Sequence, residues 1–114
     1  MTSVTDLSHY IGKEVLLIFI FDLTYQKPLD EVDAHLPAHI AYLDHHYRSG
    51  DFICSGRKSP RTGGIILCRA TDRAAAQAIA EKDPFYQHGI ARYTVTEFIP
   101  SKYADGFALF AEKP

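Results

Sequence analysis

The pattern of hydrophobic and polar positions changes period along the chain, and its first clear feature is an apolar run over residues 14–24 (EVLLIFIFDLT). This run is rich in β-branched and aromatic residues and is too short for an amphipathic helix, which predicts a strand. Because apolar and polar residues do not alternate in it, we expect a central strand buried on both faces. Residues 1–13 precede it and are expected to form an N-terminal extension with one short helical turn that ends at Gly12.

Residues 33–48 (DAHLPAHIAYLDHHYR) have the spacing of an amphipathic helix and contain four of the six histidines. Apolar residues that recur at helical spacing predict its core-facing stripe, which consists of Leu36, Ile40, Leu43 and Tyr47. His39 lies on the same stripe, whereas His45 and His46 are expected on or beside the solvent face. A histidine in that position is either a core residue that hydrogen-bonds a carbonyl or a functional group in a pocket.

Proline, glycine and capping residues set the limits of the elements. The first helix is expected to begin near Asp33, because Pro37 is tolerated only near a first turn, and Asp30 or Asp33 is its candidate N-cap. Asp83 precedes Pro84 and should end a second, alanine-rich helix. The other predicted elements are strands over 52–58, 64–70 and 91–99, a hairpin turn over 59–63, the second helix over 73–82, and a tail over 101–114.

The resulting order, strand–helix–strand–strand–helix–strand, predicts one α+β domain over residues 14–100 with a ferredoxin-like antiparallel sheet. In this arrangement both helices cover one face of the sheet. Since the strands are apolar on both faces, the uncovered face would be a large exposed patch. We therefore expect a homodimer in which two such faces pack together.

The same topology places several polar residues at the end of the sheet where the first strand finishes. His39 in the first helix and Asp83 at the end of the second should come close there, and a carboxylate on one ring nitrogen would orient the other for general acid/base catalysis. The simpler alternative for Asp83 is that it only caps a turn. Ser55 and Arg57 are candidate substrate contacts near the same end.

Other charged and metal-binding patterns near this end are weaker. Arg57, Lys58 and Arg61 would suit an anionic substrate, although charged hairpin tips are usually only solvated. His35 and His39, four residues apart, share a helix face, but no nearby Cys or Glu completes a familiar metal set. We therefore predict no metal and no cofactor. There is also no motif of a serine or cysteine nucleophile and no phosphate-binding glycine loop.

Composition restricts the class of protein further. The chain has 114 residues, 46% of them hydrophobic, and a net charge of −2, which argues against nucleic acid and acidic membranes as partners. Its start has neither the basic residues nor the apolar run of a signal peptide, so a cytoplasmic location is expected. Cys54 and Cys68 are then expected as reduced thiols, and pairing of Lys58 with Gly64 in the hairpin would place them opposite each other.

The chain resembles the YCII-related (YciI-like) domain family over roughly residues 15–103. The segments that carry the resemblance are HIAYL at 39–43, FICSG around Gly56, PRTGGIIL at 60–67, DPF at 83–85 with Gly89 downstream, and VTEFIPSKY at 95–103. The resemblance implies a dimeric α+β barrel and a pocket around a histidine–aspartate pair, which falls on His39 and Asp83. The segment before the histidine is LPA, whereas other branches of the family have an arginine there.

The resemblance also implies chemistry on small molecules. Some relatives are enzymes, among them a dehydrochlorinase that acts on a chlorinated hydroxyquinol, and the fold neighbours muconolactone isomerases. Together with the residues, this predicts an enzyme that transfers protons on a small, anionic or aromatic substrate through His39 and Asp83. The alternatives are a non-catalytic dimer that binds a small molecule and a structural dimer with a satisfied core histidine.

Overall fold

A computed structural model of the chain describes residues 17–111. In chain order its elements are β1 (Leu17–Tyr25), α1 (Leu29–Arg48), β2 (Phe52–Arg57), β3 (Gly63–Ala70), α2 (Arg73–Ala80), α3 (Pro84–Gln87), β4 (Ala91–Phe98), η2 (Asp105–Phe107) and α4 (Ala108–Ala111). The predictions for residues 1–13 and for the first three residues of the run 14–24 lie outside the described residues. In the described part, no helix is both long and apolar enough to cross a bilayer.

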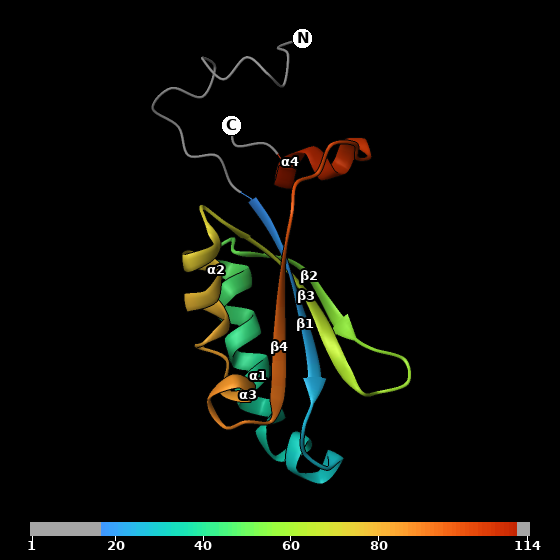
Figure 1. Cartoon of the computed structure of the whole chain (residues 1–114), viewed down its shortest axis with the longest axis vertical. Helices are drawn as coiled ribbons and strands as arrows, with labels where there is room; N and C mark the ends of the chain where they lie inside the picture. Colours follow the sequence, from blue (N-terminus) through green and yellow to red (C-terminus); the bar gives the residue numbers. More distant parts are fainter. Residues whose placement is uncertain (1–16, 112–114) are drawn as a thin grey trace.

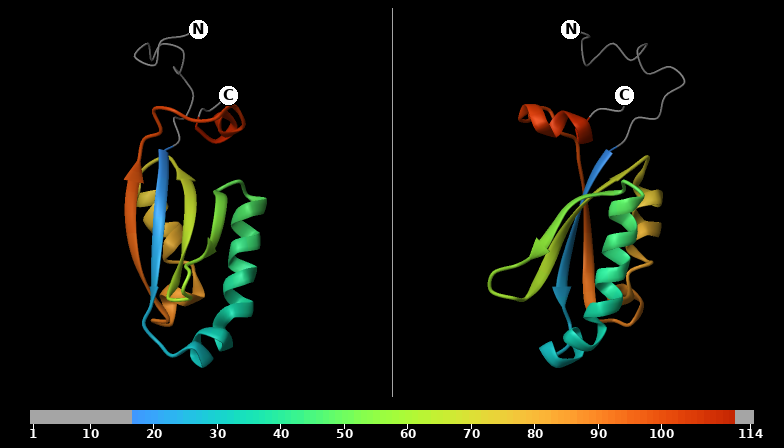
Figure 2. Two further views of the ribbon diagram at one scale, coloured as in Figure 1. Left: turned by 90° about the vertical axis from the view of Figure 1, so that its right-hand side faces the viewer. Right: turned by 180° about the vertical axis from the view of Figure 1, so that it is seen from behind.

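The four strands form one antiparallel sheet in the order β2-β3-β1-β4. The helices α1, α2 and α3 lie on one side of this sheet, and α4 lies beyond the end where β1 starts (Figure 1). The opposite face of the sheet is open to view in Figure 2. This α+β arrangement is the one predicted from the order of elements, and it is consistent with a ferredoxin-like fold.

Burial along β1 corrects the expectation of a strand covered on both faces. Phe19, Phe21 and Leu23 are buried under the helices, with at most 2% of each exposed. On the other face, Ile20 and Asp22 are only partly buried, whereas Ile18 near the start of the strand is 1% exposed. One chain therefore buries the helix-covered face of β1 and the start of the other face, and leaves Ile20 only partly covered.

The buried face of α1 is rotated from the predicted stripe. Within α1 the buried residues are Val32, His39, Tyr42 and His46. Ile40 and Tyr47 are 46% and 39% exposed, so their assignment to the core was wrong. His46 was expected near solvent but is 3% exposed, because aromatic rings and not aliphatic side chains fill the space below the end of α1.

The start of α1 also differs from the prediction. The helix begins at Leu29 after Pro28 and has no side-chain cap, so neither Asp30 nor Asp33 is its N-cap. Pro37 lies inside the helix, where it deprives the carbonyl four residues earlier of its usual donor. Helix α2, in contrast, has a side-chain cap, since the Asp72 carboxylate accepts a hydrogen bond from the backbone N–H of Ala75.

The hairpin of β2 and β3 has a register that differs by one residue from the prediction, because Arg57 and not Lys58 pairs with Gly64. Cys54 therefore faces Leu67, and a further slip between Phe52 and Cys54 places Phe52 opposite Cys68. The predicted juxtaposition of the two cysteines is therefore wrong. Both thiols are free, Cys54 exposed and Cys68 buried, and burial raises the pKa of Cys68 to about 12. Gly63 begins β3, where a Cβ atom would lie 1.8 Å from the Leu23 carbonyl oxygen.

Candidate functional site

The structure brings His39 and Asp83 together across the interface of α1 and α3. His39 Nδ1 lies 2.9 Å from Asp83 Oδ1, and Asp83 is fully buried. Asp83 is held there because it is the N-cap of α3, and its Oδ1 accepts from the backbone N–H of Phe85 at 2.9 Å. Asp83 therefore does cap a helix, as the simpler alternative held, and the same oxygen is also hydrogen-bonded to the imidazole of His39.

The second oxygen of Asp83 is occupied as well. The Tyr93 hydroxyl on β4 donates to Oδ2 at 2.5 Å. Because the backbone N–H and the hydroxyl both donate, the carboxylate acts as an acceptor throughout, as an ionised carboxylate does. His39 Nδ1 then carries a proton, and in the neutral ring Nε2 is left as the base.

Stacked and buried aromatic rings hold this pair in place. The His39 ring stacks on Phe85 with centroids 4.0 Å apart and planes 2° apart, and only 9% of the residue is exposed. Burial, followed by the negative charge of Asp83, raises the pKa of both Tyr42 and Tyr93 well above the ordinary value. Both phenols therefore stay protonated at neutral pH, and Tyr93 acts on Asp83 only as a donor.

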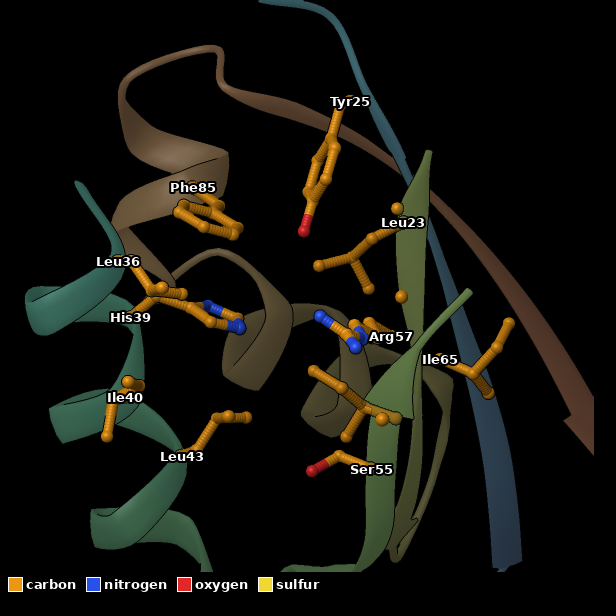
Figure 3. Close-up of a pocket in the computed structure, with 14 residues that line it drawn as sticks. Leu23, Tyr25, Leu36, His39, Ile40, Leu43, Ser55, Arg57, Ile65 and Phe85 are labelled. Carbon is orange, nitrogen blue, oxygen red and sulfur yellow. The ribbon is translucent and has the colours of Figure 1, made fainter. Parts of the chain in front are cut away.

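A cavity of about 280 Å³ lies next to His39, between α1 and the β2–β3 hairpin (Figure 3). Most of its wall is aliphatic or aromatic. The apolar lining residues are Leu23, Leu36, Ile40, Leu43, Ile65, Ile66 and Phe85, and Figure 3 shows the Ile65 side chain turned away from the cavity. The polar side chains are His39, Tyr25, Ser55 and Arg57, and Figure 3 shows the Tyr25 hydroxyl and the Arg57 guanidinium pointing into the space beside the imidazole. Such a cavity, apolar with a few convergent polar groups, is typical of a small-molecule site.

Both residues predicted as substrate contacts line this cavity. Ser55 Oγ lies 2.7 Å from the Tyr47 hydroxyl, so a neighbour already orients it. Arg57 is exposed and has no ion-pair partner among residues 17–111.

The other two hairpin cations are engaged by carboxylates. Lys58 Nζ lies 2.6 Å from Asp22 Oδ1, and Arg61 lies 2.5 Å from Asp33 Oδ1. The hydrogen bond with Asp33 also raises the pKa of Arg61. Of the three cations singled out in the sequence, Arg57 alone both lines the cavity and lacks such a partner in the described part of the chain.

The side chains of His35 and His39, considered above as possible metal ligands, do not point to a common site. His35 Nδ1 lies 3.1 Å from the carbonyl oxygen of Glu31, its ring lies against His88, and His39 turns instead to Asp83. Within residues 17–111, no group of three or more Cys, His, Asp or Glu side chains is placed to hold a metal ion.

Comparison with known proteins gives the family. Residues 18–99 match the YCII-related domain. The chain belongs to this family. No curated protein matches its sequence. Among solved structures, the fold is similar to that of 5-chloro-2-hydroxyhydroquinone dehydrochlorinase from Burkholderia phenoliruptrix AC1100 in complex with 2,5-dihydroxybenzoquinone. The TM-score is 0.63, the identity is 18%, and the match covers 71% of this chain and 92% of the other.

Three residues around the site of this YCII-related protein were not singled out as site residues in the sequence. Tyr93 bonds Asp83, Phe85 stacks on His39, and Tyr25 lines the cavity. Apolar and polar residues alternate along β4, and this pattern could have placed Tyr93 on the helix-covered side of the sheet. The structure has Tyr93 there, opposite Leu23. The Phe85 ring could not be placed without the short α3, which the sequence suggested only as a turn.

Proposed function

We propose that this YCII-related protein is a small-molecule enzyme in which His39 is the general acid/base and Asp83 orients it. The single observation that carries this proposal is the hydrogen bond from His39 Nδ1 to the buried Asp83, in a ring that also lines the cavity. In the reaction, Nε2 takes a proton from the substrate, and Asp83 stabilises the imidazolium that forms. Positioned proton transfer of this kind contributes roughly 10²–10⁴-fold to the rate.

The reaction class is proton transfer of the lyase or isomerase kind, including dehydrochlorination. A solved structure with a similar fold is a dehydrochlorinase bound to 2,5-dihydroxybenzoquinone, which makes hydroxylated single-ring compounds suitable first probes. Ser55 and Arg57 are proposed to contact the substrate, because both line the cavity opposite α1.

Turnover of a bound compound tests the proposal. Native mass spectrometry of the purified protein should reveal a retained ligand, and 5-chloro-2-hydroxyhydroquinone should be tried beside it with chloride release as the readout. His39→Ala should lower turnover by about 10²–10⁴-fold while leaving ligand affinity nearly unchanged. His45→Ala, an exposed histidine of the same helix, is the matched control.

The outcome of this experiment also decides between the enzyme and the alternatives. A ligand that binds beside His39 but is not consumed by the wild-type protein would favour a non-catalytic binding protein. Equal turnover by the wild type and His39→Ala would remove the acid/base role, and Asp83 would then be a helix cap only.

We also propose that the chain forms a homodimer through the open sheet face, which gives a dimeric α+β barrel. The register places Ile20 beside Leu67 on this face, and Ile65 lies next to them on the same strand as Leu67. All three are only partly buried, and Phe98 at the far edge is 46% exposed. An apolar face of this kind on one chain is typical of an interface.

The mass in solution tests the dimer. Sedimentation at micromolar concentration should give twice the mass of one chain. Leu67→Asp should shift it to the single-chain mass, whereas Leu109→Asp, 73% exposed on α4, should leave it unchanged. A single-chain mass for the unmodified protein would contradict the proposal.

A further inference from the structure

The charged groups around the cavity are of one sign. The lining residues include Arg57 and the ionisable His39, but no aspartate or glutamate. Asp83, the carboxylate of the candidate pair, is not among the lining residues, and both of its oxygens are already hydrogen-bonded. An anionic ligand would therefore meet no negative side chain in the lining of the cavity.

The Arg57 guanidinium is also free to bind a ligand. Lys58 and Arg61, close to it in the hairpin, are each neutralised by a carboxylate, but no ion-pair partner is placed on Arg57 within residues 17–111. In Figure 3 its guanidinium points toward the edge of the His39 ring, with the Tyr25 hydroxyl on the same side. Two kinds of donor thus converge on the space beside the base, next to an apolar wall that reduces the screening of charge.

From this placement we propose that the cavity selects a small organic oxyanion, a single-ring carboxylate, phenolate or enolate, whose charged oxygen is bound by Arg57 and Tyr25. The proposal deepens the proposed function and rests on it, because it assumes that the cavity beside His39 is the substrate site. Its size supports a single ring, since about 280 Å³ is at the small end of ligand-binding pockets.

The arrangement has a consequence for the proposed chemistry. When His39 Nε2 removes a proton from an uncharged carbon or oxygen acid, the electrons of the broken bond move onto an oxygen and form an enolate or phenolate. A guanidinium already in place beside that oxygen stabilises the charge as it develops. Arg57 thus favours a substrate that is already an oxyanion as well as an uncharged one that becomes an oxyanion when its proton is removed.

Binding of benzoate and of its uncharged analogue benzamide tests this inference directly. Calorimetry or ligand-detected NMR on the full chain should show benzoate binding about tenfold more tightly than benzamide, with benzoate binding weakened by added salt. Arg57→Gln should reduce the affinity for benzoate about tenfold and leave that for benzamide unchanged, whereas Arg57→Lys should restore part of the preference. Arg48→Gln, an exposed arginine in the last turn of α1, is the control of equal charge.

Three results would overturn the inference: equal affinity for the two probes, equal behaviour of Arg57→Gln and Arg48→Gln, or no binding of either probe. The experiment is independent of turnover. If His39→Ala keeps the preference for benzoate but no substrate is ever turned over, the oxyanion site stands and the acid/base function fails. If turnover depends on His39 but benzoate shows no preference, the function stands and the oxyanion site fails.

Discussion

Helix α1 carries two histidine–aspartate pairs with nearly the same bond and different surroundings. His39 Nδ1 lies 2.9 Å from Asp83, and His46 Nδ1 lies 2.8 Å from Asp51. Both histidines are buried, at 9% and 3% exposure. The hydrogen bond alone therefore does not distinguish the His39–Asp83 pair from the His46–Asp51 pair.

The difference lies in what surrounds each pair. Asp51 is five residues from His46, its side chain is 33% exposed, and it also accepts from Ser49 Oγ, so this pair joins the end of α1 to the start of β2. Asp83 is 44 residues from His39 and fully buried, and the His39 ring borders the cavity. Access to a cavity, and not the bond itself, distinguishes a candidate catalytic pair from a structural one.

The largest expected difference is in the loss of unfolding free energy when each aspartate is replaced by alanine. Asp83→Ala removes the acceptor of three buried donors, from His39, Phe85 and Tyr93, and should lower the free energy of unfolding by about 3–5 kcal/mol. Asp51→Ala exposes its partners to water and should cost about 1 kcal/mol. Urea unfolding of both variants measures this, and equal losses would show that burial of Asp83 has no energetic consequence.

A second, smaller difference should appear when each histidine is replaced by leucine, which has a similar volume. His39→Leu leaves the charge of Asp83 buried without its imidazole and should cost about 2–3 kcal/mol. His46→Leu keeps the packing against Tyr42 and Phe52, and Asp51 retains solvent and Ser49, so the cost should be about 1 kcal/mol. Thermal and urea unfolding check the order, and a larger loss for His46→Leu would reverse the interpretation of the two pairs.

The sequence predicted the first pair and missed the second for identifiable physical reasons. The topology follows from hydrophobic period and breaker residues, and it places the early part of α1 near the end of α2 whatever the details of packing. His39 and Asp83 could therefore be paired from the sequence. His46 was expected on or beside the solvent face because the predicted stripe ended at its neighbour Tyr47, whereas Tyr42 and His46 are the residues that pack on the aromatic core under this end of α1.

Other misses have local causes that no hydrophobic pattern encodes. The register at the hairpin turn, in which Arg57 and not Lys58 pairs with Gly64, separates the two cysteines, and the apolar pattern of β2 does not specify which residue ends the turn. Pro37 suggested a helix start that the structure does not have, because a proline inside a helix is costly but not excluded. The ion pairs that neutralise Lys58 and Arg61, and so distinguish Arg57, depend on side-chain positions.

The smallest expected effect is the contribution of each aspartate's charge to the pKa of the two buried tyrosines. Burial and then Asp83 raise the pKa of Tyr42 and Tyr93 above 10.0, and Asp51 is the weakest of the causes that raise the pKa of Tyr42. The folded state holds these two protons more tightly than the unfolded chain. Their stabilisation is therefore complete below about pH 10 and declines as the pH rises above it, by at most about 1.4 kcal/mol per unit for each tyrosine.

Removing the two charges in turn separates their contributions to the raised pKa values. Asp83→Asn should lower the pKa of both tyrosines toward the ordinary value, so that the decline of unfolding free energy ends at a lower pH, whereas Asp51→Asn should leave both pKa values almost as in the wild type. Tyrosinate absorbance during an alkaline titration gives an independent measure of the same shift. If both variants lower the two pKa values equally, the two pairs share one electrostatic environment, and the distinction between them rests on the cavity alone.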